Sequence, residues 1–204
     1  MRNNFFIILL IFSLCFSHPV LAQGDETDLG GKAVCFVRGN SPFKKFIADQ
    51  NRILLFQGED GAFGSIQLQS VLSNREEFLA DVNILAIFEQ IKNLNSFLNG
   101  KTQTFDNSDS ELTLKKINKS DQVTTTVSDF FNDGSKSLIN GRIKLLNRNN
   151  LANGSVRLGF LNSTIKVTSK TGETIESNEN NGSIKINCKF KEIPIEIKDL
   201  KSSQ

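Results

Sequence analysis

The 204-residue sequence has no Trp or Tyr and contains one His, one Met and three Cys, and all of its aromatic residues are Phe. The one histidine is His18, so the chain beyond the N-terminal segment has no imidazole to act as a general base or metal ligand. This excludes a Ser-His-Asp triad and a Cys-His pair there. The loop that begins at Asp129 also lacks the third and twelfth ligands of a calcium loop. We therefore expect no metal site and no cofactor.

The absence of Trp and Tyr also bears on carbohydrate enzymes. Paired carboxylates for glycoside hydrolysis are available, because their separation is spatial rather than sequential. Such sites usually hold sugars on aromatic platforms, however, and a chain whose aromatic residues are all Phe is better suited to building a core. The sequence therefore predicts a protein that is not an enzyme.

Two short motifs concern a Ser-Lys hydrolase. Residues 41 to 44 (SPFK) fit S-x-x-K and residues 170 to 172 (KTG) fit K-T-G, which resemble the signature of penicillin-binding proteins and serine β-lactamases. The third element, S-D-N, is incomplete, because Ser120 and Asp121 are followed by Gln122. A hydrolase that uses carboxylates or this Ser-Lys pair is thus the least favoured reading.

Residues 1 to 22 have the layout of a cleavable secretory signal. A short positive start precedes an apolar run from Phe5 to Phe16, and the small residues Val20 and Ala22 follow, which predicts cleavage before Gln23. The run is shorter than the roughly 20 residues that span a bilayer, and no later segment approaches that length. We expect a periplasmic or secreted protein with no integral membrane span after cleavage.

Two cysteines, Cys35 and Cys188, remain beyond the predicted signal. In an oxidising compartment an even pair predicts a disulfide. The alternative is two separate buried thiols, since free Cys is often buried. A bridge would tie the first predicted strand to the last one.

The chain beyond the signal is long enough for one domain. We expect a mobile leader at residues 23 to 31, a single β-rich domain at residues 32 to 198 and a polar tail at residues 199 to 204. Residues 32 to 37 are apolar on both sides, which predicts a strand covered on both faces with Cys35 in the interior. Further strands are predicted at 52 to 57 and 62 to 72, and alternating apolar and polar residues predict strands in most of the chain after residue 111. Pro42 predicts a short helix that contains Phe46 and Ile47.

The strongest helix signal lies in residues 74 to 99. Ser73 and Glu76 have the spacing of a capping box, and Gly100 is placed to end the helix. Apolar residues then recur at intervals of three and four, namely Phe78, Val82, Leu85, Phe88, Ile91, Leu94 and Leu98. The expected fold class is therefore α+β, with an antiparallel sheet or open barrel of about eight strands packed against one long amphipathic helix.

Positive charge is concentrated toward the C-terminus. Residues 138 to 198 hold ten basic and five acidic side chains, a net charge of +5, whereas residues 23 to 137 have a net charge of −4. Much of the surplus falls on alternate strand positions, at Arg142, Lys144, Arg157, Lys166, Lys185, Lys189 and Lys191. Two readings remain open. One is a solvated outer face whose lysines discourage strand association, and the other is a face for an anionic partner, such as a lipid headgroup or an acidic polymer.

These observations favour an exported, non-catalytic binding protein whose ligand is apolar or anionic. The partner would be a protein or a lipid or other anionic component of the cell envelope, and nucleic acid is not expected outside the cell. The alternative function is that of a structural or surface-assembly subunit.

Overall fold

The computed structural model describes residues 29 to 39, 41 to 42, 44 to 74, 78 to 106, 110 to 118, 120, 124 to 129, 140 to 160, 163 to 180 and 183 to 200. The predicted signal at residues 1 to 22, most of the predicted leader and residues 201 to 204 lie outside the described residues. Strands make up 77% of the structure and helix 4%, arranged as a curled half-barrel. The predicted α+β class is therefore wrong, because in the residues that the structure describes no long helix packs on the sheet.

In the described part of the chain, the elements follow one another as strands, with one short helix. In chain order they are β1 (Lys32–Gly39), β2 (Lys45–Ala48), β3 (Gln50–Gly58), β4 (Gly61–Asn74), β5 (Phe78–Ile91), α2 (Leu94–Leu98), β6 (Gln103–Asp106), β7 (Glu111–Asn118), β8 (Thr124–Asp129), β9 (Asn140–Arg148), β10 (Leu151–Phe160), β11 (Ser163–Thr168), β12 (Thr174–Asn180) and β13 (Ile184–Asp199).

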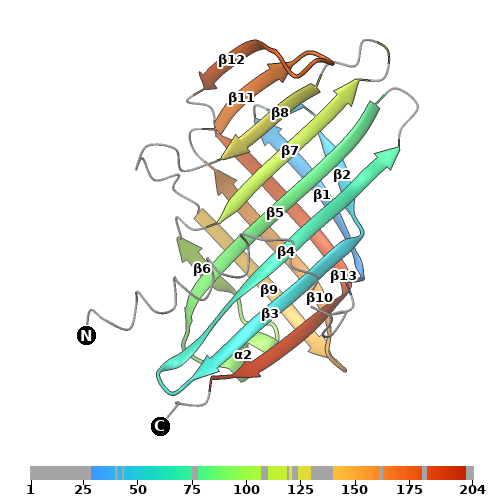
Figure 1. Cartoon of the computed structure of the whole chain (residues 1–204). Helices are drawn as coiled ribbons and strands as arrows, with labels where there is room; N and C mark the ends of the chain where they lie inside the picture. Colours follow the sequence, from blue (N-terminus) through green and yellow to red (C-terminus); the bar gives the residue numbers. More distant parts are fainter. Residues whose placement is uncertain are drawn as a thin grey trace.

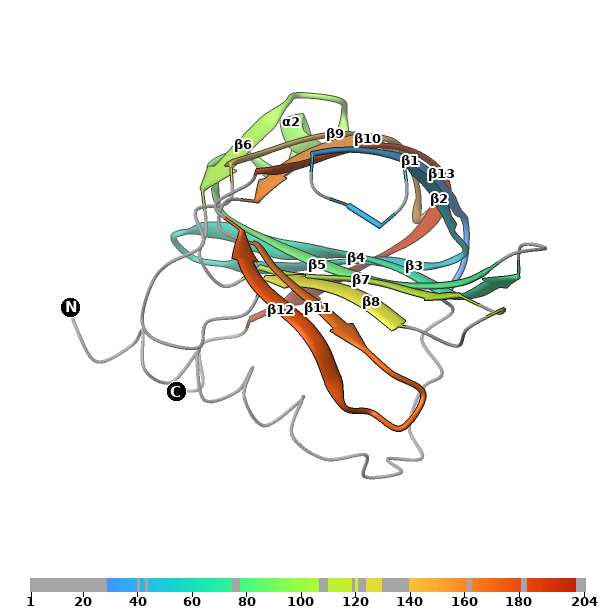
Figure 2. The same ribbon diagram turned by 90° about the horizontal axis from the view of Figure 1, so that it is seen from above.

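The strands form two layers that share β13 (Figure 1). The front sheet has the order β12, β11, β8, β7, β5, β4, β3, and the last part of β13 pairs in parallel with β3. The back sheet has the order β6, β9, β10, β13, β1, β2, with antiparallel pairing throughout. Figure 2 shows the back sheet arched over the front sheet. The core lies between these two layers.

A β-bulge lets β13 pass from one layer to the other. Lys191 and Glu192 of β13 stand opposite the single residue Asn153 of β10, and Glu192 has a positive φ of 57°. The Glu192 amide donates to Asn153 Oδ1 at 3.3 Å. A bulge of this kind bends its strand and increases the local twist. Beyond Pro194, β13 leaves β10 and continues beside β3.

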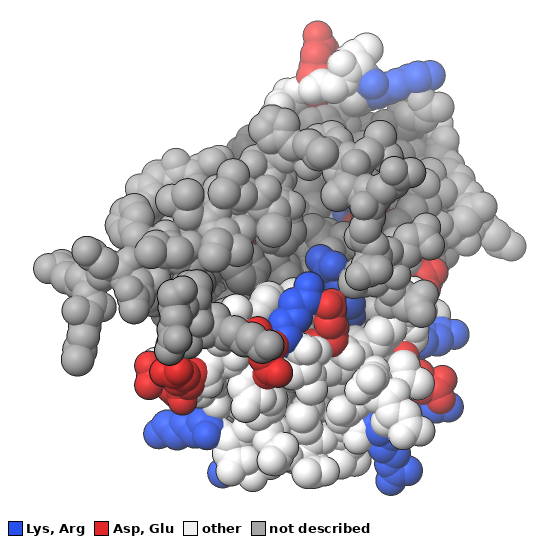
Figure 3. Space-filling view, turned by 60° about the horizontal axis from the view of Figure 1, so that its bottom comes forward, with Lys and Arg blue, Asp and Glu red and all other residues white. Residues whose placement is uncertain are grey.

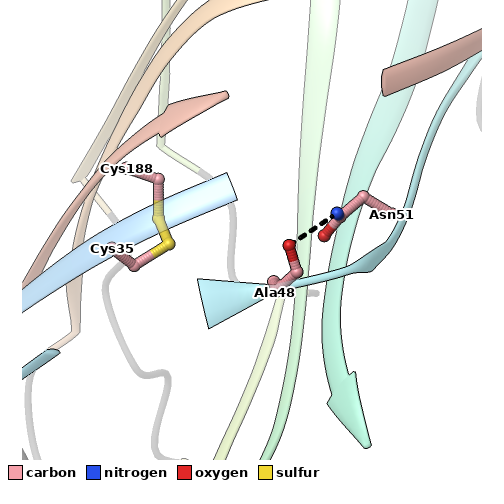
Figure 4. Close-up of a disulfide and its surroundings, with 4 residues drawn as sticks. All are labelled: Cys35, Ala48, Asn51 and Cys188. Carbon is pink, nitrogen blue, oxygen red and sulfur yellow. Dashed lines mark hydrogen bonds between the residues drawn. A yellow bond between two sulfur atoms is a disulfide. The ribbon is translucent and has the colours of Figure 1, made fainter. Parts of the chain in front are cut away.

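The disulfide between Cys35 and Cys188 is confirmed (Figure 4). The two cysteines are direct register partners on β1 and β13, with Cα atoms 4.0 Å apart, and both side chains are buried. Nearby, Asn51 Nδ2 donates to the carbonyl oxygens of Ala48 at 3.0 Å and Gly31 at 3.3 Å. The cystine and this amide thus fasten β1 and β2 to their neighbours.

The predicted helix at residues 74 to 99 is replaced mainly by β5, which pairs with β4 and β7. Val82, Ile84 and Phe88 are at most 1% exposed and face the core, whereas Leu85 points to the opposite side of the front sheet, away from the core cluster. Because apolar residues occur on both faces of β5, intervals of three and four arise without a helix. Among the described residues of this range, α2 is the helical part, and there Asn93 Oδ1 accepts a hydrogen bond from the Ser96 amide at 2.8 Å.

Other local predictions had mixed outcomes. The strands predicted at residues 52 to 57 and 62 to 72 are confirmed as β3 and β4, which pair as a hairpin as far as Gly58 and Gly61. The short helix predicted after Pro42 is wrong, because Phe46 and Ile47 belong to β2, which pairs with β1. The pairing of this segment with β1 outweighs the local preference of Pro42 for the start of a helix.

Gly154, beside the bulge, provides a test of the packing between β9 and β10. A Cβ atom at this position would collide with the Lys144 carbonyl oxygen and lie 2.9 Å from Leu145 Cα. We expect Gly154→Ala to lower the free energy of unfolding by about 1 to 3 kcal/mol, as measured by urea denaturation. Gly159→Ala on the same strand is the matched control, because its nearest atom would be 3.5 Å away. Equal stability of the two variants would contradict this packing.

Candidate functional site

The outer surface of the back sheet is a basic face. Side chains alternate along each of its strands, so that buried apolar residues point to the core and exposed residues point outward. We define the basic face by the exposed Lys and Arg residues of β1, β2, β9, β10 and the first part of β13. These are Lys32, Arg38, Lys45, Arg142, Lys144, Arg148, Arg157, Lys185, Lys189 and Lys191.

Strand register places several of these cations directly opposite one another. Arg142 is the cross-strand partner of Arg157, Lys32 is the partner of Lys191, and Arg38 is the partner of Lys185. Like charges in such pairs destabilise a sheet. The arrangement therefore carries an electrostatic cost that an anion bound across the strands would relieve.

The basic face contains almost no acidic side chains. In the described strands that form it, from β1 and β2 to β9, β10 and residues 184 to 192 of β13, Glu192 is the only carboxylate. Its Oε1 lies 3.3 Å from Lys191 Nζ, and both side chains are more than half exposed, so the pair is weak. Figure 3 shows the end of the molecule at the bottom of Figure 1, where side chains of both signs surround a mostly uncharged surface.

Phe36 adds an apolar element to this face. It is 53% exposed, and Lys45 Nζ lies 5.6 Å from the centre of its ring. Such a cation–π contact at an exposed site contributes about 0.5 to 1 kcal/mol. The contact holds the lysine in place and leaves much of the ring in solvent.

The structure brings together six of the seven basic residues predicted from the sequence. Lys166 is the exception, because it lies on β11 of the front sheet, opposite Thr126 and Ser177. Sequence reasoning missed the contribution of β1 and β2, which lie in the acidic part of the chain. Lys32 and Arg38 alternate with buried residues along β1, and the predicted disulfide ties β1 to β13. Together these two observations would have placed Lys32 and Arg38 beside β13.

A hollow of about 450 Å³ lies at one end of the basic face. It is lined by Leu146, Arg148, Leu151, Asn153, Lys191 and Glu192. A second hollow of about 440 Å³ lies between the end of β5, α2 and β6, above the buried rings of Phe97 and Phe105. The charged residues that line this second hollow are Glu89, Lys92 and Lys101, so it has one acidic and two basic side chains, as the first hollow does.

The fragments of a Ser-Lys motif are not assembled into a site. Ser41 precedes β2 of the back sheet, whereas residues 170 to 172 form the turn between β11 and β12 at the edge of the front sheet. In that turn the Gly172 amide donates to the Ser169 carbonyl oxygen at 3.0 Å. Across the described part of the chain, no three His, Cys, Asp or Glu side chains gather in a group that would hold a metal ion.

Comparison with known proteins leaves the basic face as the main guide to function. No family model, curated protein or solved structure matches the chain. In the residues that the structure describes, no helix is long and apolar enough to cross a membrane. The disulfide fits a protein of an oxidising compartment, periplasmic or extracellular.

Proposed function

We propose that this chain is an exported, non-catalytic binding protein that holds an anionic component of the cell envelope on its basic face. The observation that carries the proposal is the set of outward Lys and Arg side chains on adjacent strands with Glu192 as the one described carboxylate among them. A surface of one sign attracts an oppositely charged partner and raises its association rate. The secretory layout of residues 1 to 22 and the disulfide support a location outside the cytoplasm.

The back sheet is rigid, which supports binding of an anion to a fixed array of cations. Every strand of the basic face is paired within the back sheet, and the cystine joins β1 to β13. The backbone therefore holds the cations at set distances, so that an extended polyanion or a charged surface meets them together. Several weak contacts made at once give a higher affinity than any single one.

The test is a comparison of two variants that each remove two positive charges. Arg142→Gln/Arg157→Gln alters the centre of the basic face, and Lys166→Gln/Lys170→Gln alters exposed lysines at the edge of the front sheet. At an ionic strength of about 0.15 M, we expect the arginine variant to bind immobilised dextran sulfate at least about tenfold more weakly. The lysine variant should bind nearly as well as the unmodified protein.

Salt dependence and folding serve as further controls. Binding of the unmodified protein should weaken as salt is raised, because exposed charges are screened. The lysine variant should retain the thermal melting temperature of the unmodified protein, because both side chains are exposed. The arginine variant should melt at the same or a slightly higher temperature, because it removes the opposed like charges of Arg142 and Arg157. If the two variants lost affinity equally, attraction would depend on net charge alone and the assignment to the basic face would be refuted.

A further inference from the structure

The hairpin between β9 and β10 presents two leucines to solvent at one end of the basic face. Its turn is Asn149 and Asn150, both with positive φ values of 53° and 59°, as a tight two-residue hairpin requires. Leu146 is 44% exposed and Leu151 is 38% exposed, with Arg148 between them in the sequence. An isolated exposed leucine is ordinary, but two leucines on one hairpin within a basic face form a specific amphipathic element.

The bulge in β13 lies beside these leucines. β13 stays paired with β10 as far as Pro194, the partner of Leu151, and the hollow of about 450 Å³ is lined by residues of the hairpin and of the bulge. Leu146 and Leu151 supply the apolar part of its lining, and Arg148 and Lys191 supply two positive charges beside the carboxylate of Glu192, whose Oε1 lies 3.3 Å from Lys191 Nζ. The Ile195 amide donates to the Asn150 carbonyl oxygen at 2.9 Å and fixes the hairpin against β13.

From this arrangement we infer that the anionic partner is the surface of a lipid bilayer, which the hairpin end of the basic face contacts. This inference rests on the proposed function and names its partner. Leu146 and Leu151 enter the boundary between headgroups and acyl chains, and Arg148, Lys191 and Lys144 contact lipid phosphates. Apolar burial together with attraction to anionic lipid is the physical basis of interfacial binding.

A soluble acidic polymer would engage the same cations but has no apolar layer to receive the leucines. The leucines of the hairpin should therefore contribute to binding of a bilayer and not to binding of a soluble polymer. Loss of the leucines should weaken binding to a bilayer and leave binding to dextran sulfate unchanged. This difference separates failure of the inference from failure of the proposed function.

The first experiment uses flotation with vesicles of phosphatidylglycerol and phosphatidylcholine in equal parts. We expect Leu146→Ser/Leu151→Ser to bind these vesicles about tenfold more weakly than the unmodified protein, and to bind dextran sulfate equally well. The single variants Leu146→Ser and Leu151→Ser are each compared with Ile175→Ser, which removes an apolar residue that is 62% exposed on β12. The β12 control should bind vesicles normally.

The second measurement reports insertion directly. Because the chain has no Trp, Leu151→Trp introduces a single fluorophore at the hairpin. Its emission should shift to shorter wavelength on the anionic vesicles and should not shift with dextran sulfate, whereas Ile175→Trp should shift with neither.

The outcomes are distinct. Binding of the unmodified protein to dextran sulfate but not to the anionic vesicles would overturn the lipid inference and identify an acidic polymer as the partner, with the proposed function intact. Vesicle binding by the double leucine variant equal to that of the unmodified protein, without an emission shift for Leu151→Trp, would also overturn it. If Arg142→Gln/Arg157→Gln bound both probes as tightly as Lys166→Gln/Lys170→Gln, the proposed function itself would fail.

Discussion

Removing the disulfide by Cys35→Ala/Cys188→Ala is expected to lower the free energy of unfolding by about 2 to 5 kcal/mol under non-reducing conditions. The two cysteines are separated by 153 positions, so the bridge closes most of the folded chain into one loop and restricts the unfolded state. Alanine is chosen over serine because a buried serine hydroxyl without a hydrogen-bond partner would add a separate cost in free energy. Urea denaturation followed by circular dichroism measures the difference.

The control for the disulfide is the reduced protein. With a reductant present, the unmodified chain and the alanine variant should unfold at nearly the same urea concentration, apart from the volume lost at two buried side chains. Equal midpoints without a reductant would show that the bridge contributes nothing to stability. The β1–β2 pair should respond most, because β2 reaches the sheet through its pairing with β1.

The second large effect is expected at Ile84, whose side chain has no exposed surface in the core. Ile84→Asp would place a carboxylate among apolar side chains with no cation to pair with it, at a cost of several kcal/mol. Since most domains are stable by only about 5 to 15 kcal/mol, we expect little or no soluble folded protein. The yield of soluble protein and the strand signal in circular dichroism measure the outcome.

The neighbouring residue provides a matched control. Asn83 faces outward on β5, and its Oδ1 accepts a hydrogen bond from Gln69 Nε2 at 3.2 Å. Asn83→Asp adds the same charge one position away and keeps an oxygen for that bond, so it should fold normally. A folded Ile84→Asp protein, or equal loss of both variants, would refute the alternation of faces along β5.

Local sequence pattern was sufficient for elements whose two faces differ in polarity. The last strand alternates Ile184, Ile186, Cys188 and Phe190 with polar residues, and the structure keeps this alternation up to the bulge. In β5 the pattern failed, because Leu85 and Ile87 are apolar on the outward face and obscured the period of two. Whether such a segment is a strand is decided by its partners β4 and β7, which local spacing does not reveal.

The candidate site could likewise be predicted from local pattern only in part. Alternation placed Arg142, Lys144 and Arg157 correctly on one side of their strands. It also grouped Lys166 with them, although β11 belongs to the other layer. Which strands lie side by side depends on contacts between distant parts of the chain, and the contributions of Lys32 and Lys45 follow from such contacts.

The position of β13 has a consequence for how this protein is made. This strand is the partner of β1, β10 and β3, so it lies in the middle of one layer and at the edge of the other. A ribosome that makes the chain from its N-terminus supplies residues 184 to 199 after all the other strands. Neither layer is complete until then, and a fold dominated by such distant pairings forms slowly. For an exported protein, as proposed above, this order would leave the unfinished chain open while it is threaded through a narrow export channel.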